Sequence, residues 1–304
     1  MLRITFLGTS AAQPTLARSL SGLALRREGE LLLFDCGEGS QRQMMRYGTG
    51  FAVDAVFFTH FHADHYLGLL GFLRTLSMQG REAPLHLYGP APAGRLLDQA
   101  IHLGLDHYSF EVPIHELRGG EVIQRTGYAV QALPVEHGLP ALGFALVEDE
   151  RPGEFQLDRA RALGIPEGPL FGKLQHGGAV ALPDGRTIAP HQVLGPPRRG
   201  RKVVVSGDTR PCDAVARAAQ GADLLVHEAT FAEGERARAL ETRHSTAREA
   251  ARLAREAGVR RLVLTHFSSR YEDDLGDLAR EAREELPGVQ LAQDGLTIEV
   301  PLPG

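Results

Sequence analysis

The hydrophobic positions of this chain fall into short apolar runs that alternate with segments of helical periodicity. The runs predict strands at residues 4–7, 22–26, 30–34, 55–58 and 85–88, several within 110–147, and others at 202–206, 223–227, 261–265 and 296–300. Helices are predicted at residues 41–47, 68–78, 93–103, 211–219, 246–257 and 274–286, with Ser245 and Thr246 as candidate N-cap residues. The alternation predicts an α/β fold in which one sandwich forms the core.

One segment, residues 151–200, breaks this rhythm. It is dense in proline and glycine, as at Pro152-Gly153, Pro183-Asp184-Gly185 and Gly195-Pro196-Pro197, and such residues interrupt both helices and strands. We therefore predict a single domain over residues 1–304 with an inserted arm at about residues 151–200. Lys173 lies within the arm and Arg198 and Arg199 lie at its end. Taken alone, such charges are more typical of a solvated surface loop.

The most informative polar cluster directly follows the apolar run at 55–58. The segment Thr59-His60-Phe61-His62-Ala63-Asp64-His65 places three imidazoles and one carboxylate at the end of a predicted strand. Neutral ring nitrogens and carboxylate oxygens bind zinc-like ions at about 2.0–2.2 Å. A solvated loop would explain one histidine but not three around an aspartate. The cluster therefore predicts a metal site, in which His60 and His62 face one ion and Asp64 and His65 face a second.

These four positions do not complete two coordination shells, so the chain needs further ligands. Three later segments each place a candidate just beyond a predicted strand, namely His137, Asp208 and His266. Open α/β sheets collect their functional groups at strand ends. A lone histidine after a strand is more often structural, but four strand ends with ligand-type residues form a specific pattern. Asp35, which follows another strand, is equally consistent with a turn and with a carboxylate that orients a ligand.

Composition and charge change this picture only in part. The 304 residues, 43% hydrophobic and 23% charged, are ordinary for a globular protein, and no apolar run is long enough for a membrane span. The N-terminus begins directly on a predicted strand, and Cys36 and Cys212 give no disulfide framework. Both features favour a cytoplasmic location. The net charge of −5 argues against a nucleic-acid substrate, but local fields and two bound divalent ions would offset it.

The order of these segments resembles the metallo-β-lactamase fold and, more narrowly, the tRNase Z family within it. The narrower resemblance rests on FLGTSAAQP (6–14), FDCGEGSQRQMM (34–45), HEATF (227–231), RHSTAREAA (243–251) and LTHFSSRY (264–271), and it covers essentially the whole chain. The chain departs from the family pattern Pro-x-Lys-x-Arg-Asn, because Leu16 and Ser19 stand at its Lys and Asn positions. The resemblance implies a four-layer αββα sandwich with a protruding arm.

The resemblance also implies roles for individual residues. It implies two zinc ions per chain, although a site rich in histidine also accepts manganese or iron. One ion would bind His60, His62 and His137, the other Asp64, His65 and His266, and Asp208 would bridge them. His244 would be the general acid, held by Glu228, and Asp64 would also act as general base. Ser268 and Arg270 are candidates for holding the phosphate beside the cut, and Lys173, Arg198 and Arg199 for binding the tRNA body.

The function implied by the resemblance is removal of the 3′ trailer from precursor tRNA, which leaves a 3′-hydroxyl, by a homodimeric endonuclease. Two alternatives remain open at this point. One is a phosphodiesterase of the same fold that acts on small phosphodiesters. The other is a metal-binding RNA-interaction module without catalysis, although all seven ligand positions are filled.

Overall fold

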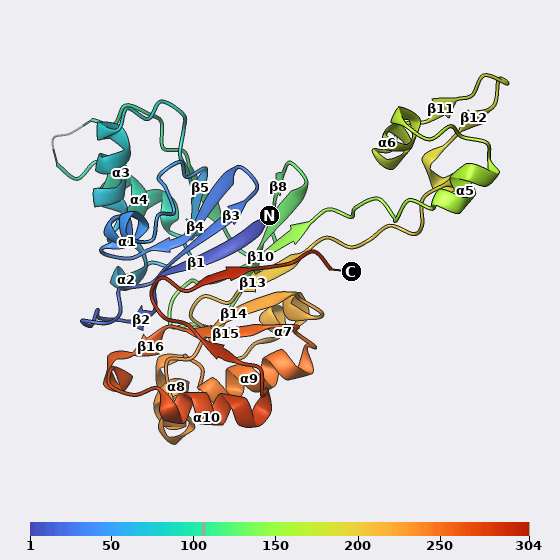
Figure 1. Ribbon diagram of the computed structural model, residues 1–304. Helices are drawn as coiled ribbons and strands as arrows, with labels where there is room; N and C mark the ends of the chain where they lie inside the picture. The colour runs from blue at the N-terminus through green and yellow to red at the C-terminus, as the bar shows by residue number, and fades with distance from the viewer. Residues whose placement is uncertain (105–106, 304) are drawn as a thin grey trace.

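Two seven-stranded β-sheets face each other, and helices cover the outer face of each sheet (Figure 1). The computed structural model describes residues 1–104 and 107–303. The four-layer αββα sandwich predicted from the sequence is therefore confirmed. In the described part of the chain, no helix combines the length and the apolar character that a membrane crossing requires.

The first sheet has the strand order β18-β1-β3-β4-β5-β6-β7. Its strands are β1 (Leu2–Gly8), β3 (Gly22–Arg27), β4 (Glu30–Cys36), β5 (Ala55–Phe57), β6 (His86–Pro90), β7 (Ile114–Leu117) and β18 (Thr297–Glu299). Strands β4 to β7 are mutually parallel. Its outer face carries α1 (Ser40–Arg46), α3 (Leu69–Met78) and α4 (Ala93–Ile101), and the short α2 (Ala63–Tyr66) follows β5.

The second sheet has the order β17-β15-β14-β13-β10-β9-β8. Its strands are β8 (Val122–Arg125), β9 (Tyr128–Pro134), β10 (Leu142–Glu148), β13 (Lys202–Val205), β14 (Leu224–Glu228), β15 (Leu262–Thr265) and β17 (Gln290–Leu291). Strands β13, β14, β15 and β17 are parallel. Helices α7 (Asp213–Ala219), α9 (Ala247–Glu256) and α10 (Gly276–Glu285) cover it, and α8 (Arg236–Thr242) precedes α9.

Aromatic side chains form the centre of the layer between the two sheets. Phe34 and Phe57 of the first sheet stack at 5.3 Å between ring centroids, and Phe144 of the second sheet meets Phe57 edge-on at the same distance. Buried strands of parallel sheets are apolar on both faces, which explains why residues 55–58 form a continuous apolar run. Because the strands run parallel, their polar C-terminal loops all emerge at one edge of the sandwich.

The arm leaves the sandwich after β10 and returns at β13 (Figure 1). It contains α5 (Leu157–Ala162), α6 (Pro169–Gln175), a hairpin of β11 (Val180–Ala181) and β12 (Thr187–Ile188), and the 3₁₀ turn η1 (Pro190–Gln192). These elements pack around their own cluster, which includes Ala160, Ile165 and Leu174. The proline and glycine density of this segment does not by itself indicate these elements, which are short and depend on packing against one another.

The two strands of the arm's stalk lie close together. Arg151 pairs with Arg198 and Phe155 with Leu194 in antiparallel bridges. Between these bridges, a Cβ atom on Gly153 would lie 2.0 Å from the carbonyl oxygen of Gly195. Only glycine allows this approach of two backbones.

The predicted helices and strands of the sandwich are present, and their ends match the prediction or differ from it by one or two residues. Helix α9 begins after Thr246, whose side chain accepts a hydrogen bond from the backbone of Glu249 in a capping box. Two short helices, α2 and α8, are not predicted, because four to seven residues give too few turns for a periodic pattern.

Candidate metal centre

The loops after four parallel strands meet at one edge of the sandwich. Asp35 ends β4, the loop that starts at Thr59 follows β5, Asp208 follows β13 and His266 follows β15. A turn after β9 adds His137. The structure therefore brings the seven predicted ligand residues together, from positions 60 to 266 of the chain.

Four of these residues form a first group, namely His60, His62, His137 and Asp208. The Nδ1 atom of His62 lies 3.0 Å from Nε2 of His60 and 3.3 Å from Nε2 of His137. The Oδ2 atom of Asp208 lies 3.5 Å from Nε2 of His60. All four ligand atoms lie within 4.8 Å of one another.

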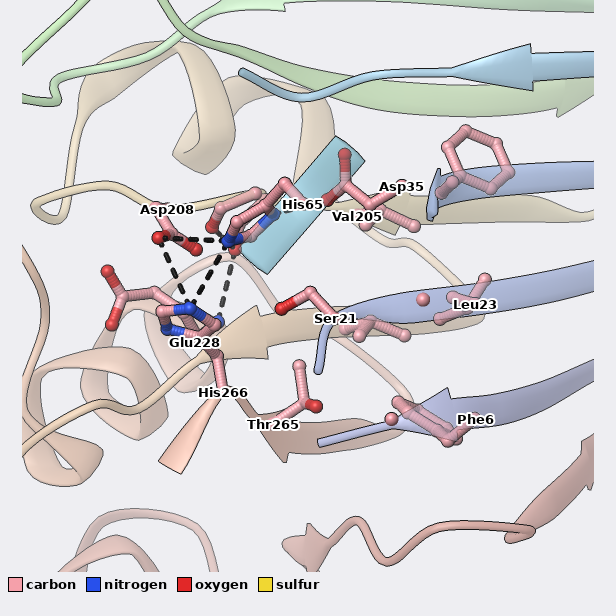
Figure 2. A pocket seen from close by; sticks show the side chains of 16 residues that line it. Phe6, Ser21, Leu23, Asp35, His65, Val205, Asp208, Glu228, Thr265 and His266 are labelled. Atoms are coloured by element: carbon pink, nitrogen blue, oxygen red, sulfur yellow. Dashed lines mark hydrogen bonds and ion pairs between the residues drawn. The ribbon is translucent and has the colours of Figure 1, made fainter. Parts of the chain in front are cut away.

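The second group consists of Asp64, His65 and His266. The two Nε2 atoms of His65 and His266 are 3.3 Å apart, and Oδ2 of Asp64 lies 3.4 Å from the first and 3.5 Å from the second. Oδ2 of Asp208 is 3.4 Å from His65 and 3.3 Å from His266. Asp208 therefore faces both groups, as Figure 2 shows for its contacts with His65 and His266.

These separations fit bound metal ions. Ligand atoms about 2.0–2.2 Å from a tetrahedral ion lie about 3.4 Å from each other. Burial and the neighbouring rings lower the pKa of His60, His62 and His137, which keeps these rings neutral. Unprotonated nitrogens that face one another repel unless a cation lies between them. The donors are all nitrogen or oxygen, which suits a divalent ion of the zinc type.

Hydrogen bonds behind the ligands fix the orientation of four histidine rings. In each case Nδ1–H donates to a neighbour and leaves Nε2 for the site: His60 to Thr59 at 3.0 Å, His65 to Asp35 at 2.8 Å, His137 to the Arg243 carbonyl at 3.1 Å and His266 to Thr230 at 2.9 Å. Such partners select the tautomer that binds metal. Asp35 also accepts hydrogen bonds from the backbone and the hydroxyl of Thr59, so it orients ligands.

Asp64 has a further partner on the opposite side of the site. The backbone N–H of Ala12, a residue with the left-handed φ of 61°, donates to Oδ2 of Asp64 at 2.8 Å. Burial opposes ionisation of Asp64, but hydrogen bonds with His266 and His65 outweigh burial and lower its pKa. The carboxylate is therefore ionised and held on both sides.

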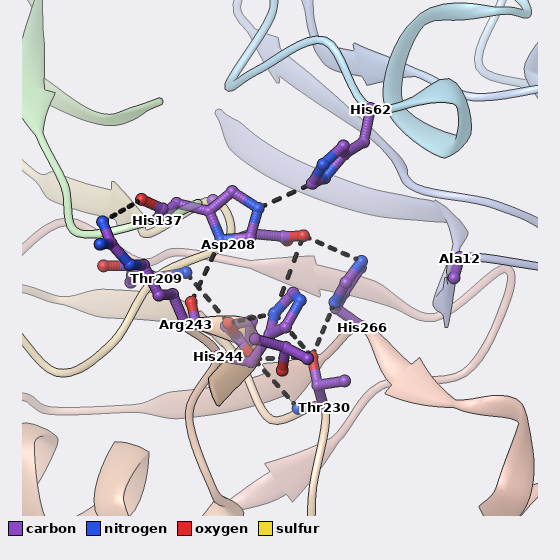
Figure 3. Close-up of polar contacts among 12 residues, drawn as sticks. Ala12, His62, His137, Asp208, Thr209, Thr230, Arg243, His244 and His266 are labelled. Carbon is purple, nitrogen blue, oxygen red and sulfur yellow. Dashed lines mark hydrogen bonds and ion pairs between the residues drawn. The ribbon is translucent and has the colours of Figure 1, made fainter. Parts of the chain in front are cut away.

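His244 lies beside the two ligand groups. Its Nδ1–H donates to Oε1 of Glu228 at 2.8 Å, and the same nitrogen is 3.9 Å from Oδ2 of Asp208. Burial opposes protonation, but the charge of Glu228 and its hydrogen bond raise the pKa of His244 to about 9. Glu228 is buried and is also held by the backbone and hydroxyl of Thr230 and the backbone of Thr209. These contacts favour the protonated form of His244, and Figure 3 shows the ring beside Asp208 and Thr230.

The ligands open onto a cleft of about 570 Å³. Ser268 and Arg270 line one wall, and Arg238 and Thr242 of α8 line another. Arg270 pairs with Glu235 at 2.8 Å and covers the ring of Phe231 at 5.1 Å. Behind the ligands, a smaller cavity of about 50 Å³ lies between the sheets, so His65 and Asp208 lack tight packing on that side (Figure 2).

The arm residues lie apart from the metal centre (Figure 1). Lys173 on α6 and Arg198 on the stalk are exposed. Arg199 is bonded through Nη1 and Nη2 to both carboxylate oxygens of buried Asp223, at 2.8 and 2.7 Å. Arg199 therefore anchors the root of the arm to the sandwich.

Sequence reasoning missed several residues that support the site, among them Ala12, Thr59, Thr230 and Arg243. Ala12 acts through its backbone N–H and Arg243 orients the His137 ring through its backbone carbonyl, and such groups leave no residue-type signature. Thr230 lies in the HEATF segment and contacts Glu228, His244 and His266. Its position two residues after Glu228 is the signal that could have indicated it.

Comparison with known proteins agrees with this geometry. A family model for the metallo-beta-lactamase superfamily matches residues 19–266. Ribonuclease Z of Myxococcus xanthus is 67% identical over 303 residues, which cover 99% of each chain. Ribonuclease Z of Gemmatimonas aurantiaca is 54% identical over 99% of this chain and 96% of its own. The crystal structure of human tRNase Z, short form, superposes with a TM-score of 0.70 at 29% identity, over 98% of this chain and 99% of that one.

The fold and the site therefore define a metallo-β-lactamase-fold protein with a site for two divalent metal ions. The full-length matches narrow this class further. The chain belongs to the ribonuclease Z family.

Proposed function

We propose that this chain is a metal-dependent endoribonuclease that removes the 3′ trailer from precursor tRNA. The observation that carries the proposal is the position of His244, whose Nδ1 is 2.8 Å from Glu228, beside Asp208, the carboxylate that faces both ligand groups. The names of its relatives, Ribonuclease Z and tRNase Z, support the same substrate.

Bound divalent ions supply Lewis acidity, which lowers the pKa of a water molecule and stabilises charge on a phosphodiester. His60, His62 and His137 would hold one ion, Asp64, His65 and His266 would hold the other, and Asp208 would be shared between them. Asp64, held by the Ala12 N–H at 2.8 Å, accepts a proton from the attacking water. The P–O3′ bond breaks, and His244 donates its Nε2 proton to the leaving 3′-oxygen. Glu228 keeps the imidazolium of His244 charged and oriented.

These steps give a tRNA with a 3′-hydroxyl and a trailer with a 5′-phosphate. Ser268 and Arg270, which line the cleft, hold the phosphate beside the cut. Because Lys173 and Arg198 are exposed on the arm, they bind phosphates of the tRNA body. Arg199, which is paired with Asp223, supports this contact by fixing the root of the arm.

For the metal itself we propose zinc, because an all-nitrogen-and-oxygen set rich in histidine suits it. Manganese and iron share these ligand preferences. Metal analysis of protein purified from its own host decides among the three.

We further propose that the protein works in the cytoplasm as a homodimer. The two buried free cysteines, Cys36 and Cys212, suit a reducing compartment. Sedimentation equilibrium at micromolar protein concentration tests the dimer, and a monomer at all concentrations would contradict it.

The direct test is incubation of the purified protein with a precursor tRNA, with and without chelator. We expect one cut next to the discriminator base and its loss on chelation. A protein that binds the precursor without cutting it would be an RNA-interaction module. A protein that hydrolyses small phosphodiesters but not the precursor would be a different phosphodiesterase.

A further inference from the structure

Arg243 has a backbone conformation that is unusual for a residue with a side chain. It ends α8 with φ 57° and ψ 47°, in the left-handed region, and directly precedes His244. This conformation is unfavourable for a non-glycine residue and persists where surrounding contacts impose it. The contacts of Arg243 therefore indicate the role of this backbone conformation.

Arg243 and His137 are bonded to each other in both directions. Nη1 of Arg243 donates to the carbonyl oxygen of His137 at 2.9 Å, and Nδ1–H of His137 donates to the carbonyl oxygen of Arg243 at 3.1 Å (Figure 3). The first bond holds the backbone of the loop that carries His137. The second holds its ring, with Nε2 turned to the first ligand group.

The two residues that follow Arg243, His244 and Ser245, are held by the loop that contains Thr209 and Arg210. The His244 carbonyl accepts a hydrogen bond from Nη1 of Arg210 at 2.5 Å, and the hydroxyl of Ser245 donates to the Thr209 carbonyl at 2.6 Å. Arg210 is in turn paired with Glu249 of α9. The left-handed turn at Arg243 lets its carbonyl meet His137 while the His244 ring reaches Glu228.

We propose that Arg243 is a positioning residue that holds the metal ligand His137 and the proton donor His244 in one relative position. Its carbonyl orients the ring of His137, and its guanidinium fixes the backbone of His137. The part of this inference that concerns His244 rests on the proposed function, whereas the part that concerns His137 rests only on the metal site.

The variants Arg243→Gly and Arg243→Lys isolate the contribution of the guanidinium, because both keep the backbone carbonyl. Glycine adopts the left-handed conformation freely and keeps the carbonyl but removes the guanidinium. Lysine keeps a donor that can reach the His137 carbonyl. Arg217→Ala is the control, because Arg217 is an exposed arginine on α7 whose side chain pairs with exposed Asp213.

The first readout is the affinity of the metal-free protein for Co²⁺. The absorption spectrum of the bound Co²⁺ reports this affinity while a chelator competes for the ion. We expect Arg243→Gly to weaken binding of one ion by about 10–100-fold, as when other partners of ligand histidines are removed. Arg243→Lys should recover much of the loss, and Arg217→Ala should equal the parent. The melting temperature of metal-free Arg243→Gly should not fall, since glycine relieves the backbone conformation.

The second readout is cleavage of precursor tRNA. We expect Arg243→Gly to lower kcat by about 10-fold or more and to leave KM unchanged. A raised, salt-dependent KM with unchanged kcat and unchanged Co²⁺ affinity would mean that Arg243 binds RNA, and would overturn the proposal. Unchanged Co²⁺ affinity and kcat would also overturn it. If the parent protein fails to cut the precursor, the proposed function fails, but the Co²⁺ measurement still tests the contact with His137.

Discussion

Nδ1 of His65 lies 2.8 Å from Oδ2 of Asp35, and this contact joins the C-terminal end of β4 to α2, the helix that follows the neighbouring parallel strand β5. Asp35 itself has the left-handed φ of 59°. Its second oxygen accepts the Thr59 backbone N–H at 2.7 Å, so one carboxylate places both the start of the ligand loop and the ring of His65.

Replacing this carboxylate should therefore weaken metal binding. We expect Asp35→Asn to lower the affinity of the second ligand group by about 10–100-fold, because the amide is neutral and supports His65 less well. Titration of metal-free protein against a chelator measures the change. Asp98→Asn is the matched control, because the Asp98 side chain is exposed on α4 and also pairs with a histidine, His102. Equal affinities for Asp35→Asn and the parent would contradict this role.

The second prediction concerns proton donation by His244. When the precursor is cut, the tRNA leaves through a 3′-alkoxide that needs a proton, whereas a nitrophenolate leaves without one. We therefore expect His244→Ala to lower kcat on the precursor by about 10²–10⁴-fold, with a much smaller loss on a nitrophenyl diester. Single-turnover rates on both substrates measure the difference. Equal losses on both would show that His244 is not the acid.

The third prediction concerns stability at low pH. Glu148 is buried and bonded to Arg201 at 2.7 Å and to Arg27 at 2.8 Å. Burial opposes its ionisation, but these partners lower the pKa of Glu148 from 4.5 to about 2. Ionised Glu148 therefore stabilises the folded protein by about 2 kcal/mol. This contribution is complete above pH 4.5, the pKa of Glu148 in the unfolded chain, and is lost as the pH falls toward 2.

Urea unfolding of the metal-free protein and of Glu148→Gln tests this prediction. The difference in the free energy of unfolding between them should be largest near pH 7 and should shrink between pH 4.5 and the lowest pH at which both fold. A difference that is independent of pH would show that Glu148 contributes by packing alone.

A fourth prediction concerns the wall of the cleft. Arg238 is exposed on α8 and lines the cleft, and within the described ranges its guanidinium has no acidic partner. We expect this guanidinium to contact a phosphate of the precursor, so Arg238→Ala should raise KM for the precursor. Each contact to a single-stranded phosphate releases about 0.7 counterion. The substitution should therefore also reduce the slope of log KM against log salt concentration by about 0.7. Hydrolysis of a small diester should not change, and the exposed, acid-paired Arg217→Ala should change neither quantity.

The arm supplies the fifth prediction. Its cluster is separate from the three clusters of the sandwich. Because Arg151 and Arg198 pair across the stalk, an Asn-Gly turn can join them when residues 152–197 are removed. We expect the shortened protein to keep its hydrolysis of small diesters. Its KM for precursor tRNA should rise, so that cleavage of the precursor is lost. Unimpaired tRNA cleavage would show that the arm does not bind the substrate.

The sequence alone predicted the sandwich and the pool of metal ligands. Residues 55–58 form a continuous apolar run because β5 is buried on both faces. The polar residues His60, His62, Asp64 and His65 lie in the segment that follows its C-terminal end. His137, Asp208 and His266 likewise stand directly after strands. Such features depend on local periodicity and on residue type, which a sequence displays openly.

Only the tertiary structure decided which groups orient those ligands and which charges are already paired. The carbonyl of Arg243 holds His137 over 106 positions of the chain, and the N–H of Ala12 holds Asp64 over 52. Every residue other than proline carries the same backbone groups, so residue type gives no sign of their use. Arg199 resembles a free cation in the sequence, but buried Asp223 neutralises it in the fold. These outcomes depend on the long-range packing of strand ends, for which no local pattern exists.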